Sequence, residues 1–173
     1  VVRDPRNVIT SISHHYSLNL DESYNFITNK NKMLTEWGTE TFGMATILGS
    51  WLENYKSWKN LKFSPLLIVK YEDLLNDTKK TFTLILNFLN NLIDVKIDEN
   101  KIMNTINSCH FDVLAKKEKM EGFDESVPLK DHNKKKNFFY LGKKNNWKNL
   151  LDPKIEKKIR EEFANEMKEL GYI

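Results

Sequence analysis

The chain has 173 residues, of which 40% are hydrophobic and 12% aromatic, and this is enough material for one ordinary domain with a core. Its 27 basic and 24 acidic residues leave a net charge of +3, which does not indicate a nucleic-acid partner, so any anion site must be local. Cys109 has no second cysteine with which to form an internal disulfide, and this favours a reducing, cytoplasmic compartment.

Two further classes are disfavoured by sequence patterns. The longest apolar run, LLIV at 66–69, is far too short to cross a bilayer, so we expect no membrane segment in this chain. None of the four histidines lies in a spacing typical of metal ligands, so we expect no metal.

Strand and helix signals alternate along the chain, which predicts an α/β fold. Val1-Val2 has the character of a strand end, and Asp4-Pro5 predicts a helix start, because Asp4 can cap the helix and Pro5 lacks an N–H that the first turn does not need. Further helices are predicted over residues 22–34, 39–59, 78–92, 98–108 and 153–170, the last one stopped by Gly171.

The stretch LLIVKYEDL, residues 66–74, predicts a strand. A continuous apolar run of this kind is typical of the middle of a covered parallel sheet, and functional groups often follow such a strand. Residues 121–144 are polar, rich in lysine and without periodicity, which predicts a long loop. Long loops in compact domains are more often functional than accidental.

Arg3 and Ser11 are the first candidates for an anion site. A strand that carries Arg3 to its end, followed at once by a helix N-terminus, brings a guanidinium group and backbone N–H groups together, where a phosphate or sulfate can bind. Ser11 lies eight residues further on and can reach a bulky anion beside the helix. The alternative is an exposed Arg3 paired with Asp4 and a Ser11 hydroxyl bound to its own backbone, and spacing alone favours it.

Several stretches in the same order resemble cytosolic-type sulfotransferases across nearly the whole chain. The first is VVRDPRNVITS, in which the family has an Arg and, eight residues later, a Ser that bind the 3′-phosphate of 3′-phosphoadenosine 5′-phosphosulfate. The others are GSWLENYKSW at 49–58, LLIVKYEDL at 66–74, SCHFDVL at 108–114 and LGKKNNWKNLL at 141–151.

The resemblance implies that Arg3 and Ser11 hold the donor's 3′-phosphate and that Tyr71 and Phe111 contact its adenine. It also implies that Cys109 takes part in this site, at a position where a hydroxyl residue is common. Without the resemblance, Tyr71 and Phe111 are better interpreted as core residues.

The last motif departs from the family pattern. An Arg and a Lys precede the glycine in relatives, whereas Tyr140 and Leu141 precede Gly142 here. Lys143 and Lys144 follow the glycine and can supply the missing charge from the other side of the turn. We therefore expect Gly142 and Lys143 to belong to the donor site.

The acceptor side is less specified by the sequence. His15 falls where relatives have acceptor-pocket residues, and Trp51 is either a wall of that pocket or a core residue, the latter being favoured. The implied acceptor is a small molecule, a carbohydrate or a lipid that carries a hydroxyl or amine group. No prediction of oligomeric state follows.

The resemblance implies a P-loop-like three-layer domain, with a parallel sheet flanked by helices and a helix-rich part in this chain. In relatives the loop that wraps the 5′-phosphosulfate and the catalytic base lie upstream of the position of Arg3. We therefore expect residues 1–173 to be one sulfotransferase domain, truncated at its amino end and inactive alone. A fragment of a nucleotide-kinase-like phosphotransferase and a non-catalytic nucleotide-binding domain remain as alternatives.

Overall fold

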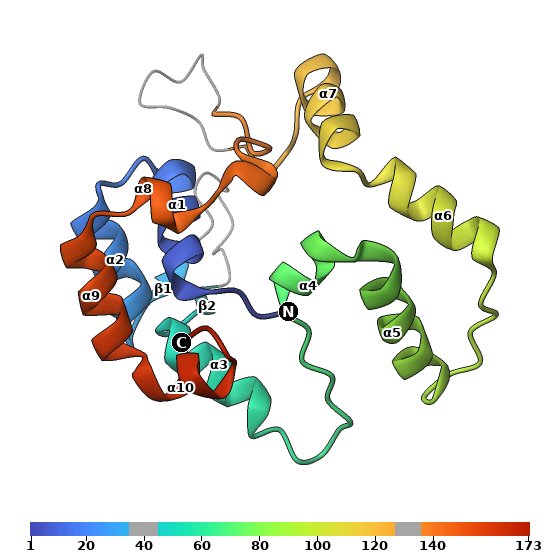
Figure 1. The fold of residues 1–173 in the computed structure, drawn as a ribbon, viewed down its shortest axis with the longest axis horizontal. Coiled ribbons are helices and arrows are strands. Elements are labelled where there is room, and N and C mark those ends of the chain that lie inside the picture. Colours follow the sequence, from blue (N-terminus) through green and yellow to red (C-terminus); the bar gives the residue numbers. More distant parts are fainter. Residues whose placement is uncertain (35–44, 127–135) are drawn as a thin grey trace. The chain divides into compact units, whose positions relative to one another are not determined.

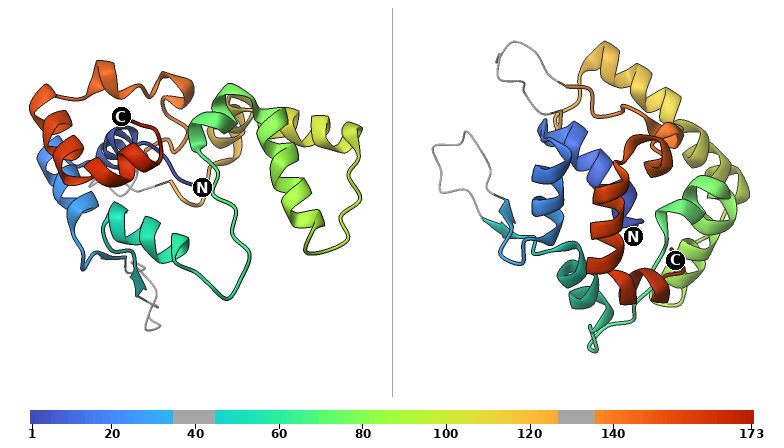
Figure 2. Two further views of the ribbon diagram at one scale, coloured as in Figure 1. Left: turned by 60° about the horizontal axis from the view of Figure 1, so that its bottom comes forward. Right: turned by 60° about the vertical axis from the view of Figure 1, so that its left-hand side comes forward.

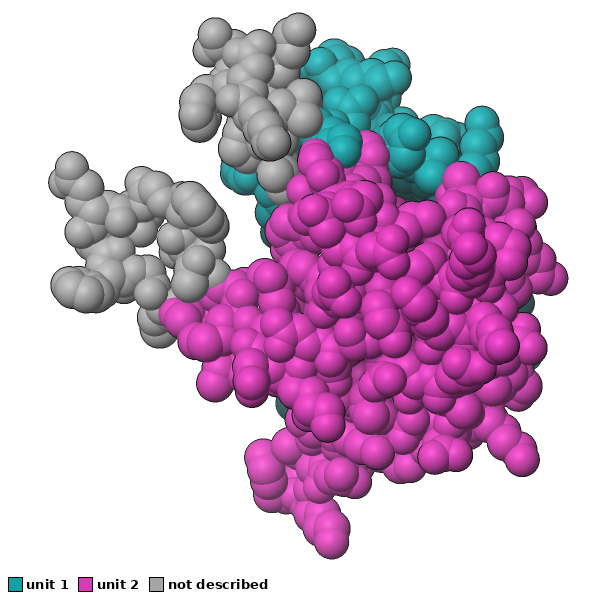
Figure 3. Space-filling view, turned by 90° about the vertical axis from the view of Figure 1, so that its left-hand side faces the viewer, with its two compact units in different colours: residues 1–3, 67–145 teal, residues 4–66, 146–173 magenta. Residues whose placement is uncertain are grey.

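The computed structural model describes residues 1–34, 45–126 and 136–173 (Figure 1). They belong to two compact units, coloured separately in Figure 3: residues 1–3 with 67–145, and residues 4–66 with 146–173. We call them unit 1 and unit 2.

Unit 2 holds most of the buried apolar side chains among the described residues. Its elements are α1 (Pro5–Tyr16), α2 (Leu20–Thr28), β1 (Met33–Leu34), β2 (Thr46–Ile47), α3 (Trp51–Lys59), α8 (Trp147–Leu150), α9 (Pro153–Glu162) and α10 (Ala164–Glu169). The antiparallel pair β1–β2 is the one sheet within the described ranges, and it places Met33 opposite Ile47.

The start of α1 confirms the sequence prediction. The Asp4 side chain accepts a hydrogen bond from the backbone N–H of Arg6 at 2.9 Å, and Pro5 occupies the first helical position. Because the cap satisfies a backbone donor that the helix itself leaves without a partner, it fixes where the chain turns into α1.

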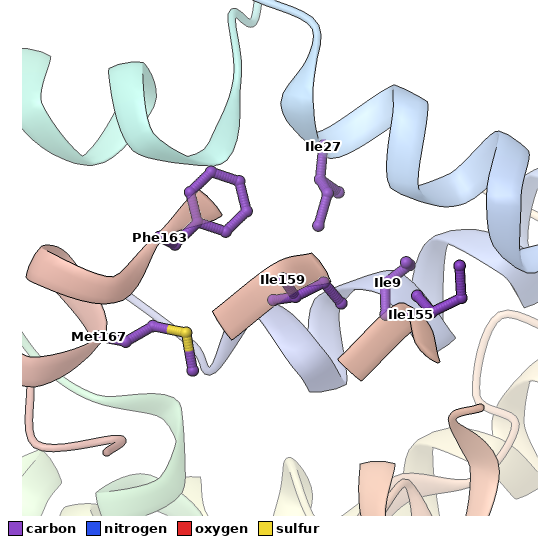
Figure 4. Close-up of a cluster of buried hydrophobic side chains, with 6 residues drawn as sticks. All are labelled: Ile9, Ile27, Ile155, Ile159, Phe163 and Met167. Carbon is purple, nitrogen blue, oxygen red and sulfur yellow. The ribbon is translucent and has the colours of Figure 1, made fainter. Parts of the chain in front are cut away.

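The core of unit 2 lies between α1, α2 and α9, which pack side by side in the views of Figures 1 and 2. Figure 4 shows six buried side chains on these helices, at the junction of α9 with α10 and on α10 itself. They are Ile9, Ile27, Ile155, Ile159, Phe163 and Met167.

The predicted carboxyl-terminal helix is two helices in the structure. It breaks at Phe163, whose backbone leaves helical geometry at φ −113° and ψ 23°. Phe163 and Met167 are nevertheless fully buried, so the apolar spacing predicted the buried residues but not the break. Gly171, at φ 69°, follows α10 as the predicted stop.

Unit 1 consists of short helices joined by loops. Its elements are α4 (Tyr71–Asn76), α5 (Thr78–Asn90), α6 (Glu99–Ser108), α7 (Phe111–Glu121) and the 3₁₀ helix η1 (Gly142–Lys144). Helices α5 and α6 confirm the predictions over 78–92 and 98–108, and Asp98 caps α6 by accepting from the backbone N–H of Asn100 at 2.8 Å. Helix α7 was not predicted.

The predicted parallel sheet is not confirmed. Residues 66–69 form no regular strand, and the pairing is reduced to one parallel bridge between Val2 and Lys70. Leu66 and Ile68 remain 38% exposed, so the apolar run is not covered as a central strand would be. A single two-stranded pairing has too few ladder hydrogen bonds to hold a long strand, because such strands gain stability from neighbours on both sides.

Two other predicted boundaries are wrong. The helix predicted over 22–34 ends at Thr28, and β1 follows it. The helix predicted over 39–59 has its start outside the described residues and, within them, begins only at Trp51, where Ser50 and Glu53 form a capping box. Trp58, in the last turn of α3, is 58% exposed.

Candidate nucleotide-donor site

The parallel bridge of unit 1 brings Arg3 beside Tyr71. The N–H of Val2 donates to the carbonyl of Val69 at 2.8 Å, and the N–H of Tyr71 donates to the carbonyl of Val2 at 2.8 Å. The residues that follow each partner are therefore neighbours. The guanidinium carbon of Arg3 lies 4.2 Å from the centroid of the Tyr71 ring, a cation–π contact.

A second contact of unit 1 joins Phe111 and Gly142. Gly142 has φ 52°, a left-handed conformation that side chains with a Cβ rarely adopt, and it begins η1. A Cβ at this position would lie 2.9 Å from the Phe111 ring, so the backbone needs glycine to approach the ring this closely. Lys143 and Lys144 follow within η1 and are both exposed.

Cys109 lies between two helices of unit 1. It is the exposed residue after the last turn of α6, and its Sγ is 3.9 Å from the Oγ of Ser108. Phe111 begins α7 two residues later. The exposed thiol can therefore meet a ligand without any change in the backbone.

Ser11 and His15 lie on α1, in unit 2. The Ser11 hydroxyl donates to the carbonyl of Asn7 at 3.1 Å, which is the local bond expected of a serine bound to its own helix. The His15 ring meets the Tyr16 ring edge-on, with centroids 4.6 Å apart. Burial raises the pKa of the Tyr16 hydroxyl above its ordinary value, so this tyrosine stays neutral at physiological pH.

Trp51 packs toward the core of unit 2. Its ring lies 5.1 Å from that of Phe163 and 6.1 Å from that of Tyr55, between centroids, and it belongs to the layer around the buried cluster. The favoured core interpretation of Trp51 is thus supported by its packing. Its predicted role in an acceptor pocket stays a prediction.

The structure thus distributes the predicted site residues over both units. Unit 1 carries six of them, and within it two pairs are in contact, Arg3 with Tyr71 and Phe111 with Gly142. The six are Arg3, Tyr71, Cys109, Phe111, Gly142 and Lys143. The three in unit 2 are Ser11, His15 and Trp51.

Sequence reasoning missed Arg6, which is only 4% exposed. Its guanidinium group pairs with Asp4 at 2.7 Å and with Glu156 at 3.4 Å, and its Cζ lies 4.0 Å from the centroid of the Trp147 ring. The nearby Asp4 was a local signal for this arginine. No local signal pointed to Glu156 or Trp147, which lie more than a hundred residues away in the sequence.

Sequence reasoning also missed Glu118, on α7. This carboxylate is buried and accepts hydrogen bonds from the backbone N–H groups of Phe138 and Phe139. A Glu in a lysine-rich stretch is expected to be an exposed charge, so the burial of Glu118 could not be predicted from the neighbouring residues.

Two kinds of feature are absent from the described ranges. No helix in residues 1–34, 45–126 or 136–173 is long and apolar enough to span a membrane. The same ranges contain no group of three or more His, Cys, Asp or Glu side chains placed to hold a metal ion.

The arrangement has the fold of a sulfotransferase, helix-rich with a small β component. It is similar to the crystal structure of mouse sulfotransferase SULT7A1 complexed with PAP, with a TM-score of 0.64 and 20% sequence identity. The match covers 96% of this chain and 56% of the mouse chain, so this chain spans little more than half the length of that relative. The family model of the sulfotransferase domain matches residues 1–171, and the chain therefore belongs to the sulfotransferase family.

Proposed function

We propose that this chain provides the 3′-phosphate and adenine side of the donor site of a sulfotransferase. The reaction is the transfer of a sulfuryl group from 3′-phosphoadenosine 5′-phosphosulfate to a hydroxyl or amine acceptor. Family membership over residues 1–171 supports the reaction class and a single sulfotransferase domain. The contact between Arg3 and Tyr71 is the observation that carries the assignment of the site.

Arg3 is the proposed ligand of the 3′-phosphate. Main-chain hydrogen bonds on both sides of Val2 hold the backbone just before it, so its direction is set by the bridge rather than by a loop. A planar guanidinium group can donate two parallel hydrogen bonds to phosphate oxygens while its face rests on the Tyr71 ring. Binding of an anion would therefore leave the cation–π contact in place.

Tyr71 and Phe111 are the proposed adenine contacts. Both rings are half-buried, so each has one face in contact with protein and a further surface that a purine can cover. Tyr71 is tied to the phosphate ligand Arg3, and Phe111 is tied to Gly142. The same two contacts thus couple the proposed base-binding rings to the proposed phosphate-binding groups, the Arg3 side chain and the Gly142 backbone.

Gly142 and Lys143 are proposed to complete the phosphate site. In η1 the backbone turns tightly, and successive N–H groups in such a turn form a concave anion site. Lys143 is exposed and adds a mobile positive charge next to it. Cys109, exposed two residues before Phe111, is proposed to line the same nucleotide site.

Ser11 is proposed as a second ligand of the 3′-phosphate, and His15 and Trp51 as acceptor contacts. The Ser11 hydroxyl bonds to the carbonyl of Asn7 at 3.1 Å, and rotation about its Cα–Cβ and Cβ–Oγ bonds can redirect the proton to an anion. His15 is half-buried beside the more exposed Tyr16, which gives an acceptor an aromatic edge to rest on.

The proposed chemistry is an in-line displacement at sulfur. The acceptor oxygen or nitrogen forms a new bond to sulfur while the bond from sulfur to the donor's 5′-phosphate oxygen breaks, and the acceptor's proton passes to a general base. The residues assigned above touch the donor far from the sulfur. Their contribution is binding energy that positions the reacting end.

The test compares two nucleotides that differ only in the 3′-phosphate. Calorimetric titration measures binding of 3′-phosphoadenosine 5′-phosphate and of 5′-AMP to the wild-type protein, to Arg3→Ala and to the control Arg160→Ala. Loss of Arg3 is expected to weaken binding of the 3′-phosphorylated nucleotide by about 2–5 kcal/mol and to leave 5′-AMP binding nearly unchanged. The exposed Arg160, with 52% of its side chain accessible, should have no effect.

Two results would contradict the proposal. One is a wild-type protein that binds both nucleotides equally or neither. The other is an Arg3→Ala variant that loses affinity for both nucleotides by the same factor, since that pattern indicates general damage to the site rather than loss of a phosphate ligand.

A further inference from the structure

Glu118 is a buried carboxylate whose two oxygens are both used. Its Oε1 accepts from the Ser126 hydroxyl at 2.8 Å and from the N–H of Phe138 at 2.5 Å, and its Oε2 accepts from the N–H of Phe139 at 3.0 Å. A carboxylate that is only 8% exposed is costly unless its oxygens are hydrogen-bonded. These bonds therefore fasten the backbone at 138–139 to helix α7.

The same helix holds the following turn through a second contact. Phe111 lies seven residues before Glu118, which is about two turns, so both side chains lie on nearly the same face of α7. The Phe111 ring lies against Gly142 and meets the Phe139 ring edge-on at 6.0 Å between centroids. Segment 138–144 is thus attached to one helix face at two points, first by Glu118 and then by Phe111.

Three aromatic rings pack against one another at this attachment, and two of them belong to the residues whose N–H groups Glu118 holds. The rings of Phe123, Phe138 and Phe139 lie within 4.9–5.3 Å of one another, between centroids. Apolar neighbours lower the local dielectric constant and so strengthen the bonds from the two backbone N–H groups to Glu118. The direction in which the chain leaves residue 139 toward Gly142 is set by this arrangement.

We propose that Glu118 is a positioning residue of the donor site. It touches no nucleotide in the assignment above. By holding the N–H groups of Phe138 and Phe139, it sets the path on which Gly142 and Lys143 meet the 3′-phosphate. This inference rests on the proposed function.

The test replaces Glu118 with Gln and uses Glu121→Gln as the matched control. Both residues lie on α7, but 62% of the Glu121 side chain is exposed. Gln keeps the size of the side chain but replaces one carboxylate oxygen with an NH₂ group, so in the same position the N–H of either Phe138 or Phe139 faces a donor and loses its bond. Amide hydrogen exchange at these two residues should be faster by about tenfold in Glu118→Gln and unchanged in Glu121→Gln.

Nucleotide binding supplies a readout that general structural damage would not produce. Glu118→Gln should weaken binding of 3′-phosphoadenosine 5′-phosphate by about tenfold and leave 5′-AMP binding unchanged, because only the 3′-phosphate meets the positioned turn. If Glu118→Gln does not fold, Glu118→Asp keeps the charge but withdraws the oxygens by one methylene, and it should show a smaller effect of the same selectivity.

The outcomes separate this inference from the proposed function. If the wild-type protein does not bind the 3′-phosphorylated nucleotide, the proposed function fails and the role of Glu118 in it fails as well. If the wild-type protein binds it and Glu118→Gln keeps the preference over 5′-AMP, the proposed function stands and the role of Glu118 is overturned. Unchanged amide exchange at Phe138 and Phe139 also overturns that role.

Discussion

Arg6 and Arg160 form a matched pair for measuring what burial adds to an ion pair. Both donate to the same carboxylate oxygen, Oε1 of Glu156, Arg6 at 3.4 Å and Arg160 at 2.8 Å. Only 5% of the Arg6 side chain is exposed, against 52% for Arg160. The shorter bond thus belongs to the more exposed arginine. Burial and bond length therefore predict opposite orders for the contributions of the two arginines to stability.

We expect the buried Arg6 to contribute more to stability than Arg160, because other groups also bind its guanidinium group. Its guanidinium group also donates to Asp4 at 2.7 Å and to the carbonyl of Tyr172 at 2.8 Å, and it stacks on Trp147. Arg6→Ala leaves the buried Asp4 carboxylate without this counter-charge, which is expected to lower the free energy of unfolding by about 3–5 kcal/mol. Arg160→Ala is expected to cost about 0–1 kcal/mol, as for other exposed pairs.

Urea unfolding monitored by tryptophan fluorescence measures both variants against the wild-type protein. A loss below about 1 kcal/mol for Arg6→Ala, or equal losses for the two variants, would refute the argument from burial. If Arg6→Ala does not fold, Arg6→Lys keeps the charge but not the planar fork, and its loss of unfolding free energy should be larger than that of Arg160→Ala.

Three further predictions concern stability. Gly142→Ala should lower the free energy of unfolding by about 1–2 kcal/mol from the left-handed backbone alone, with an added loss from the ring 2.9 Å from the new Cβ; urea unfolding at the wild-type level would contradict this. Phe163→Ala removes a fully buried ring and should cost about 3–5 kcal/mol by the same measurement, and a loss under half of that would mean the core closes over the cavity. Burial and the hydrogen bond to Glu169 raise the pKa of Tyr55 from 10.0 to about 12, so the stability contributed by neutral Tyr55 is complete below pH 10 and is lost as pH rises toward 12. The hydrogen bond from Lys59 lowers the pKa of Glu169, whose contribution is present above pH 4.5 and is lost as pH falls further. Melting temperatures across pH should therefore fall at both ends, and Tyr55→Phe should flatten the alkaline fall; an unchanged alkaline fall in that variant would contradict the assignment.

Local signals predicted the helices that have local causes. The cap at Asp4, the cap at Asp98 and the apolar spacing of residues 153–170 each specify an element through residues a few positions apart, and the structure has a helix at each place. Helix α7 was missed because its sequence, FDVLAKKEKME, has no side-chain cap and only a weak apolar stripe. Its position depends on contacts with residues 138–142, which no local pattern contains.

The strand prediction failed for a related reason. The run LLIV satisfies the composition of a buried central strand, but whether such a run becomes a strand depends on partners at its two edges. In the described residues the pairing is one parallel bridge, at Lys70 directly after the run. The composition therefore shows that the segment is able to form a strand, whereas the strands available to pair with it determine whether it does so.

The candidate site also has a part that could be predicted from the sequence and a part that could not. The residues Arg3, Tyr71 and Phe111 were predicted from motifs, and the structure adds that Arg3 contacts Tyr71 and that Phe111 contacts Gly142. The motif could not supply the residues that hold these groups in place. Glu118 has the appearance of a surface charge in the sequence, and only the three-dimensional contacts distinguish it from its exposed neighbours.

The change from Arg-Lys-Gly to Tyr140-Leu141-Gly142 gains a physical interpretation from the geometry of the turn. A glycine at positive φ reverses the chain, so residues after it can present side chains on the side from which residues before it have turned away. Lys143 and Lys144 both lie in the exposed 3₁₀ turn that Gly142 begins. Under the proposed function, the positive charge has moved across the glycine while the glycine itself stays against Phe111. The fixed element of this motif is then the backbone turn, and the side chains that carry its charge are exchangeable between the two sides.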